Sequence, residues 1–97
     1  MARYVGLTNW TDQGVRDAGS TVQRAEQVRR MVEQMGGRME TIYWTQGRYD
    51  LVAVMEAPDE ETAAAIMLRV AGGGNVRTET LRAFDAEEMG RIVQKLG

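Results

Sequence analysis

The sequence contains no cysteine and no histidine, and these two absences exclude several kinds of functional site. Without cysteine there are no disulfides, no thiolate metal ligands and no thiol nucleophile. Without histidine the chain lacks the commonest general base, a frequent metal ligand and the usual haem ligand. One copy cannot assemble a Ser-His-Asp triad, and no acidic loop has the spacing of a calcium site. We therefore expect no metal and no cofactor.

Long apolar runs and a strong charge of either sign are also missing. No segment approaches the ~20 apolar residues that cross a membrane, and the first residues do not resemble a signal peptide. We therefore expect a soluble, cytoplasmic protein without membrane contact. The 12 basic and 14 acidic side chains give a formal net charge of -2. This near balance argues against nucleic acid as a partner, because such binding needs a basic field.

The composition that remains is that of one globular domain covering residues 1–97. Hydrophobic residues make up 43% of the chain and charged residues 27%, both ordinary values. Strand-like patterns occupy 2–10, 39–45, 51–56 and 75–84. The run 51–56 is nearly all apolar, as in a central strand covered on both faces. It lies close enough to 39–45 to form a hairpin with it.

Helical spacing of apolar residues separates these strands. Ser20 and Gln23 form a capping-box pattern that predicts a first helix, which ends at Gly36-Gly37. Acidic residues from Asp59 onward predict the start of a second helix, which ends at 72–74. Asp85 with Glu88 predicts a short terminal helix. Residues 11–14 have turn chemistry, and 15–19 fit either a helical turn or a loop.

The resulting order is β-α-β-β-α-β followed by a C-terminal helix. This is the order of a ferredoxin-like α+β sandwich, in which two helices cover one face of a four-stranded antiparallel sheet. The sheet carries more large apolar side chains than we expect two short helices to cover. These side chains are Trp10, Tyr43, Trp44, Leu51, Ala53 and Met55. We therefore expect an apolar patch on the uncovered face, a homodimer or larger oligomer with sheets packed face to face, and a small cavity between them. The alternative is an ordinary monomer core closed by the terminal helix.

Three segments together resemble the GYD-domain family, which is named after a Gly-x-Tyr-Asp stretch. They are Asn-Trp-Thr-Asp-Gln-Gly at 9–14, Gly-Arg-Tyr-Asp at 47–50 and Asn-Val-Arg-Thr-Glu-Thr-Leu-Arg-Ala-Phe at 75–84. The resemblance covers essentially the whole chain and implies a ferredoxin-like fold of the dimeric α/β-barrel type. It implies no particular reaction. Related dimeric-barrel families include cofactor-free monooxygenases, isomerases, haem-binding enzymes and ligand-binding proteins, and fold does not choose among them.

Asn9 and Trp10 are the first candidate site residues, at the end of the first strand. Haem-degrading dimeric-barrel enzymes use an Asn, a Trp and a His together. This chain supplies only the first two, so the comparison argues against haem. Packing in an interface is the simpler interpretation of Trp10.

Tyr49 and Asp50 are the second pair of candidates, in the bend between two strands, and Tyr43 on the strand before the bend is a further ligand-binding candidate. Asp50 could accept hydrogen bonds from Tyr49 or Arg48 and so fix the turn. It could instead act as a general base in a half-buried pocket. Gly47 is expected to supply a backbone conformation that other residues avoid.

Arg77, Glu79 and Arg82 are the third group, on the last strand. Arg77 and Glu79 lie on one face of that strand, and Arg82 lies on the other. An arginine here could hold an anionic ligand, with Glu79 orienting it or acting as a base. The alternative is a structural ladder of ion pairs across the strands or across the dimer.

Two functions remain open from the sequence. The first is a non-catalytic oligomeric module that binds a small ligand or a protein partner. The second is a cofactor-independent enzyme that acts on a small aromatic or dicarbonyl compound in a cavity between the sheets. The missing histidine and cysteine favour the first.

Overall fold

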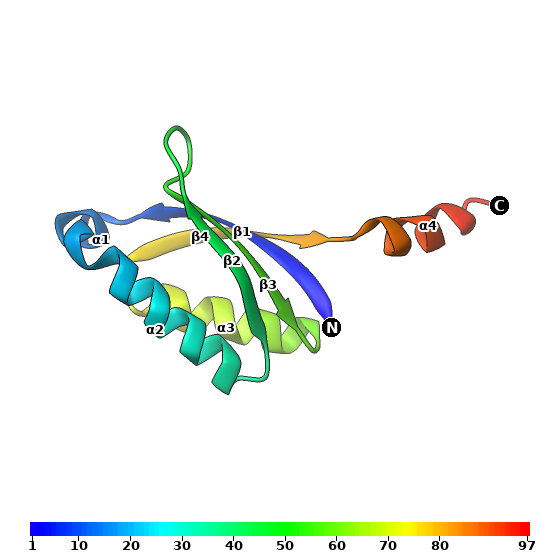
Figure 1. The fold of residues 1–97 in the computed structure, drawn as a ribbon, viewed down its shortest axis with the longest axis horizontal. Helices are drawn as coiled ribbons and strands as arrows, with labels where there is room; N and C mark the ends of the chain where they lie inside the picture. The colour runs from blue at the N-terminus through cyan, green and yellow to red at the C-terminus, as the bar shows by residue number, and fades with distance from the viewer.

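The computed structural model describes residues 1–97 as a four-stranded antiparallel sheet with helices on one face (Figure 1). The strand order is β2-β3-β1-β4, which is the ferredoxin-like order predicted from the sequence. The strands are β1 (Ala2–Trp10), β2 (Arg38–Trp44), β3 (Leu51–Ala57) and β4 (Val76–Ala83). The helices are α1 (Asp12–Arg16), the 3-10 turn η1 (Ala18–Ser20), α2 (Thr21–Gln34), α3 (Glu60–Gly72) and α4 (Ala86–Gln94).

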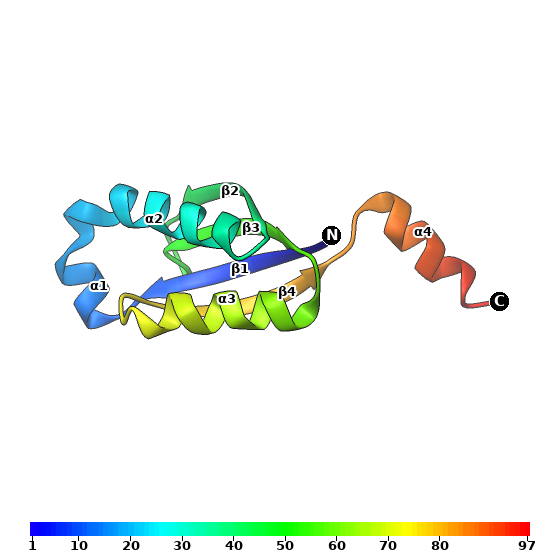
Figure 2. The same ribbon diagram turned by 90° about the horizontal axis from the view of Figure 1, so that it is seen from below.

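Helices α2 and α3 lie side by side across one face of the sheet (Figure 2). Strand β1 is central and pairs with β3 on one side and β4 on the other. Gly6 lies opposite both Ala53 and Thr80 in this register. Because side chains alternate between faces, the even-numbered residues of β1 point toward the helices and the odd-numbered ones toward the other side.

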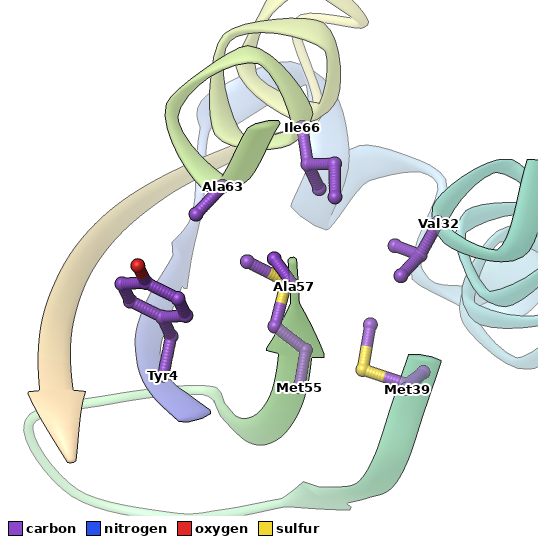
Figure 3. Close-up of a cluster of buried hydrophobic side chains, with 7 residues drawn as sticks. All are labelled: Tyr4, Val32, Met39, Met55, Ala57, Ala63 and Ile66. Carbon is purple, nitrogen blue, oxygen red and sulfur yellow. The ribbon is translucent and has the colours of Figure 1, made fainter. Parts of the chain in front are cut away.

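The core is a small cluster between the sheet and the two helices. It consists of Tyr4, Val32, Met39, Met55, Ala57, Ala63 and Ile66 (Figure 3). The link between α2 and β2 passes close to β3 here, since a Cβ on Gly37 would lie 2.7 Å from the carbonyl oxygen of Glu56. Only 8 of the 97 residues are buried. The helix layer therefore covers its face of the sheet incompletely.

The segment between β1 and α2 differs from the prediction. Residues 11–14 do not form a simple turn, because Thr11 caps α1 by accepting a hydrogen bond from the Gly14 amide at 3.1 Å. Ser20 does not cap α2, because its hydroxyl instead donates to the Asp17 carbonyl at 3.0 Å. Gly14 packs directly on the backbone of Asn75, where a Cβ would lie 1.9 Å from the carbonyl oxygen.

The start of α4 agrees with the prediction, whereas its position contradicts the alternative of a sheet closed by this helix. The Asp85 carboxylate accepts from the Glu88 amide at 2.8 Å, and the Glu88 carboxylate accepts from the Asp85 amide at 3.1 Å. Beyond this capping box α4 projects away from the sheet and covers neither face (Figures 1 and 2).

The membership of the uncovered apolar patch was predicted incorrectly. All six residues assigned to it except Tyr43 face the helices. The bulge between Met39 and Thr41 turns Trp44 inward, where its indole Nε1 donates to the Thr21 hydroxyl at 3.0 Å. Strand β3 is central, as predicted, but helices cover only one of its faces.

Candidate functional site

The uncovered side of the sheet, which we call the open face, carries a continuous apolar strip. Its members are Val5, Leu7, Val52, Val54, Leu81 and Tyr43. Val5 lies between Val54 and Leu81 in register. The central members are half-buried, whereas Leu81 is 45% and Tyr43 65% exposed. The open face is therefore apolar, as expected, although most of its residues are not those that the sequence predicted.

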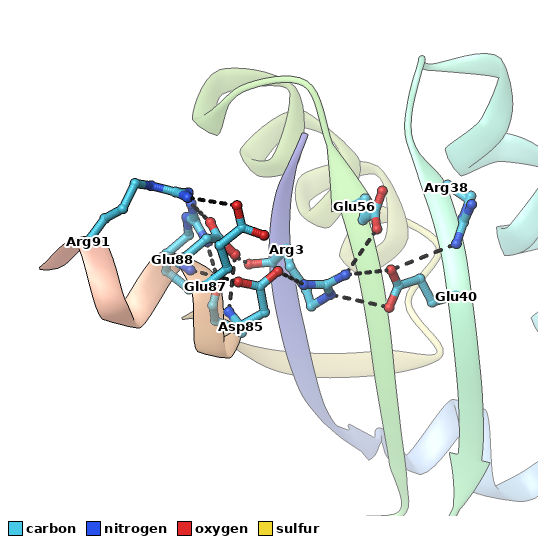
Figure 4. Close-up of polar contacts among 10 residues, drawn as sticks. Arg3, Arg38, Glu40, Glu56, Asp85, Glu87, Glu88 and Arg91 are labelled. Carbon is cyan, nitrogen blue, oxygen red and sulfur yellow. Dashed lines mark hydrogen bonds and ion pairs between the residues drawn. The ribbon is translucent and has the colours of Figure 1, made fainter.

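Arg3 forms ion pairs with three carboxylates at one end of the open face (Figure 4). Its guanidinium lies 3.1 Å from Glu40, 3.3 Å from Glu56 and 3.7 Å from Asp85. The hydrogen bond from Arg3 is the largest cause that lowers the pKa of Glu40. The pKa of Asp85 is also lowered, first by the Glu88 amide and further by Arg3. The cluster joins three strands to the beginning of α4.

The other end of the open face brings several predicted site residues together. The Tyr49 hydroxyl donates to the Glu79 carboxylate at 3.3 Å, and Asn9 lies opposite Arg77 in the β1–β4 register. Arg77 and Glu79 form no ion pair within the chain, so the alternative of a ladder across the strands is not found at these two residues. We call Asn9, Tyr49, Arg77 and Glu79 the polar rim.

Asp50 lies beside the polar rim, but its hydrogen bonds are to backbone groups. Its carboxylate accepts from the Trp10 amide at 2.9 Å, and its own amide donates to the Thr8 carbonyl at 2.9 Å. The adjacent bend contains Gly47 with a φ of +117°, a conformation that favours glycine. The Asp50 carboxylate therefore holds the end of β1, and the expected hydrogen bonds from Tyr49 or Arg48 within the turn are not formed.

Arg82 is separated from Arg77 and Glu79. It lies near the opposite end of β4, where its guanidinium stacks 4.5 Å from the Phe84 ring centre and 5.6 Å from that of Tyr4. It also pairs with Glu88 of α4 at 3.6 Å. The structure thus places Arg82 at the junction of β4 and α4.

A cavity that sequence reasoning missed lies between the sheet and the helices. Its volume is about 330 Å³, and Trp10 is the only predicted site residue in its lining. The lining contains no carboxylate. The signal in the sequence was the small residues at inward positions of neighbouring strands, such as Gly6, Ala53 and Thr78.

A metal site and a membrane-spanning helix are both missing from the structure. No cluster of three or more acidic side chains is arranged to hold a metal ion. None of the helices has the length and apolar character needed to cross a membrane.

Comparisons with known proteins place the chain in a family. The model of the GYD domain matches residues 4–93. The chain belongs to the GYD-domain family, as the three sequence segments predicted.

A curated relative and a solved structure are similar to the chain over most of its length. The relative, from Thermus thermophilus, is named "Glutamine synthetase and cystathionine beta-lyase binding protein". It is 33% identical over 90 residues, which are 92% of this chain and 95% of that protein. The crystal structure of TTHA0845 from the same organism aligns with a TM-score of 0.58 and 24% identity, over 89% of this chain and 96% of that one. The latter similarity supports the fold.

Proposed function

We propose that this protein is a non-catalytic binding module that associates with a second copy of itself through the open face and binds other proteins. The apolar open face is the observation that carries the proposal. A strip of exposed apolar residues rimmed by polar ones is typical of a protein interface. The name of the Thermus relative supports a role in binding proteins.

A second copy is the occupant that best fits the open face. Both ends of the face carry side chains of both signs, with Arg3 among acidic residues at one end and Arg77 beside Glu79 at the other. A copy related by two-fold symmetry presents the same surface in return, so opposite charges can pair at the margins while the apolar strips meet.

Helix α4 adds a second apolar surface that its own chain leaves uncovered. Met89, Ile92, Val93 and Leu96 recur at helical spacing, and Met89, Val93 and Leu96 are 49%, 51% and 83% exposed. Such an amphipathic stripe normally packs against another element. Because α4 points away from its own sheet (Figure 1), we propose that it packs on the second copy.

The polar rim is proposed to contact the partner protein. Arg77 has no acidic partner within the chain, so its guanidinium is available for a carboxylate of another molecule. Glu79 and Tyr49 are already joined by a hydrogen bond and offer a fixed pair of polar atoms beside it.

The positions of the carboxylates favour binding over catalysis. The enzyme alternative needs a base facing an enclosed substrate. Asp50 is held by the Trp10 amide, and Glu79 lies on the open face, on the other side of the sheet from the cavity.

A direct binding measurement tests the protein-binding role. Immobilised protein is titrated with purified glutamine synthetase and with purified cystathionine beta-lyase, and serum albumin serves as the control. We expect saturable binding of at least one of the two enzymes and a weakened response for Arg77→Ala. Absence of saturable binding by both enzymes would count against this role.

A further inference from the structure

The cavity between the sheet and the helices reaches solvent near the end of α3. Its floor consists of Gly6, Ala53 and Thr78, which are small residues at inward positions of three neighbouring strands. Arg69 belongs to the lining and is exposed, and so is Gly73, which lies one helical turn further along α3. Because both residues face the cavity and solvent, they mark its mouth, and Arg69 lies there.

The volume of the cavity is that of a ligand site rather than of a packing defect. It measures about 330 Å³, whereas voids in close-packed protein cores rarely exceed one water molecule. Sites that hold small molecules begin at about 300 Å³ and are mostly apolar. The cavity is therefore large enough for a compact ring system.

The apolar walls of the cavity suit an aromatic molecule. Trp10 lines the cavity at the end of β1, and Met31 and Met67 line it from α2 and α3. Aromatic rings pack favourably on one another, and methionine sulfur makes favourable contacts with them. Val28 and Val70, from the same two helices, add aliphatic surface.

Two arginines and no carboxylate make the lining positively charged. Arg24 is held by its own chain, because its guanidinium donates to the Gly14 carbonyl at 3.1 Å and to the Asp17 carbonyl at 2.6 Å. Arg69 forms no ion pair with any carboxylate of the chain. A cation in the cavity would be repelled by both arginines, whereas an anion would find an available partner in Arg69.

The exposure of Arg69 decides where the negative charge of a ligand would lie. A carboxylate buried among apolar side chains would lose its hydration, which is costly. At the mouth it can pair with the Arg69 guanidinium, whose planar donors fit both carboxylate oxygens, and it can still contact water. The apolar part of the same molecule would then lie between the sheet and the helices.

We propose that the cavity binds a compact aromatic carboxylic acid, with its rings between the sheet and the helices and its carboxylate paired with Arg69 at the mouth. The proposal does not depend on self-association, because the cavity and the open face lie on opposite sides of the sheet. The two proposals can therefore fail separately.

Two compounds of the same shape test the preference for a negative charge. Isothermal titration calorimetry of the intact chain at pH 7 compares 2-naphthoate with the neutral 2-naphthamide. We expect saturable binding of 2-naphthoate, roughly ten-fold tighter than that of 2-naphthamide, which is the gain from a charge-assisted hydrogen bond at a partly solvated site. No saturable binding of 2-naphthoate, or equal affinity for the two compounds, would overturn the proposal.

Arg69→Gln tests which residue recognises the charge. It should lower the affinity for 2-naphthoate to that for 2-naphthamide and leave the affinity for 2-naphthamide unchanged. Arg48→Gln changes the net charge by the same amount at an exposed position outside the lining and should alter neither affinity. A preference for the carboxylate that survives in Arg69→Gln, or that is lost equally in Arg48→Gln, would contradict the role of Arg69.

Gly6→Leu tests where the rings bind. A Cβ at Gly6 meets neighbours only at 3.6 Å or more, so the added side chain has room on the floor and fills the cavity. It should abolish the binding of both compounds, whereas Leu68→Ala, an exposed change on α3, should not. Unchanged binding by folded Gly6→Leu would overturn the proposal. If Gly6→Leu fails to fold, the comparison of Arg69→Gln with Arg48→Gln decides it.

Discussion

At the scale of single residues, Arg3 and Asp50 show how polar side chains fix the edges of the open face. Arg3 is a strand residue whose guanidinium reaches carboxylates on β2, β3 and the α4 cap. Asp50 uses its carboxylate to hold the end of β1. Both side chains contact polar groups of their own chain. These contacts explain why the two residues are charged, without a bound ligand.

Two substitutions of Asp50 test whether its carboxylate has a structural role. Asp50→Asn retains an oxygen that can accept from the Trp10 amide, so we expect nearly unchanged stability. Asp50→Ala leaves that amide without its partner and should lower the free energy of unfolding by about 1 kcal/mol. Denaturant titration measures both variants. Equal destabilisation by asparagine and alanine would show that the negative charge matters and would contradict a role limited to this hydrogen bond.

The lowered pKa of Glu40 predicts an acid dependence of stability. Arg3 favours the charged carboxylate in the folded chain, so folding is stabilised above the unfolded pKa and this contribution is lost as the pH falls through the folded pKa. We expect a constant melting temperature between pH 7 and about pH 5 and a fall below about pH 4.

Arg3→Gln is the variant that isolates this effect. It should lower the melting temperature more at pH 7 than at pH 3, because Glu40 loses charge in acid. Arg30→Gln, which removes a more exposed ion pair with Glu26, is the matched control and should shift the melting temperature little at either pH. An equal loss for Arg3→Gln at both pH values would disprove the role of Glu40.

At the scale of elements, α4 is a well-capped helix without a partner in its own chain. Arg3 and Arg82 fix its first turn through Asp85 and Glu88. The rest of α4 carries the apolar stripe of Met89, Ile92, Val93 and Leu96, which its own sheet does not cover.

Variants of α4 test what that stripe contacts. We expect Val93→Ser to weaken self-association by about 1–2 kcal/mol, with little change in the melting temperature at concentrations where the protein is monomeric. Arg91→Gln on the same helix should change neither. Concentration-dependent sedimentation measures the association. A large loss of monomer stability for Val93→Ser would instead show that α4 packs on its own body.

The elements themselves were predictable from the sequence because their signals are local. Helical spacing and the Asp85–Glu88 capping box indicate α2, α3 and α4. Alternation indicates β1 and β4, and a short apolar run indicates β3. Residues 11–20 were not predictable, since Thr11 and Ser20 can each cap a helix or form a turn and contacts with Asn75 select the outcome. The inward face of β2 depends on a bulge, which alternation alone does not reveal.

The candidate site was less predictable than the fold. The pairing of Tyr49 with Glu79 joins residues that are 30 positions apart, and only the strand register brings them together. The cavity arises from small residues on three strands at once, so no single segment indicates it. The family motif marked the bend at Asp50 without indicating that its carboxylate holds β1.

At the scale of the whole molecule, one copy is more extended than its length requires. The radius of gyration is 14.5 Å, whereas a compact chain of this length has about 12.5 Å. The projecting α4 explains the difference (Figure 2). One copy has few buried residues and leaves two apolar surfaces uncovered, which the proposed second copy would cover.

Sedimentation equilibrium of the intact chain tests the open-face association most directly. One copy has a mass of 10.8 kDa, so at micromolar concentration we expect at least twice that mass for the wild type. Leu81→Lys, which places a charge in the open face, should shift the mass toward one copy. Leu68→Lys, the same change at an exposed position on α3, should not. A wild-type mass of one copy throughout the micromolar range, or a dimer untouched by Leu81→Lys, would contradict the proposal that two open faces meet.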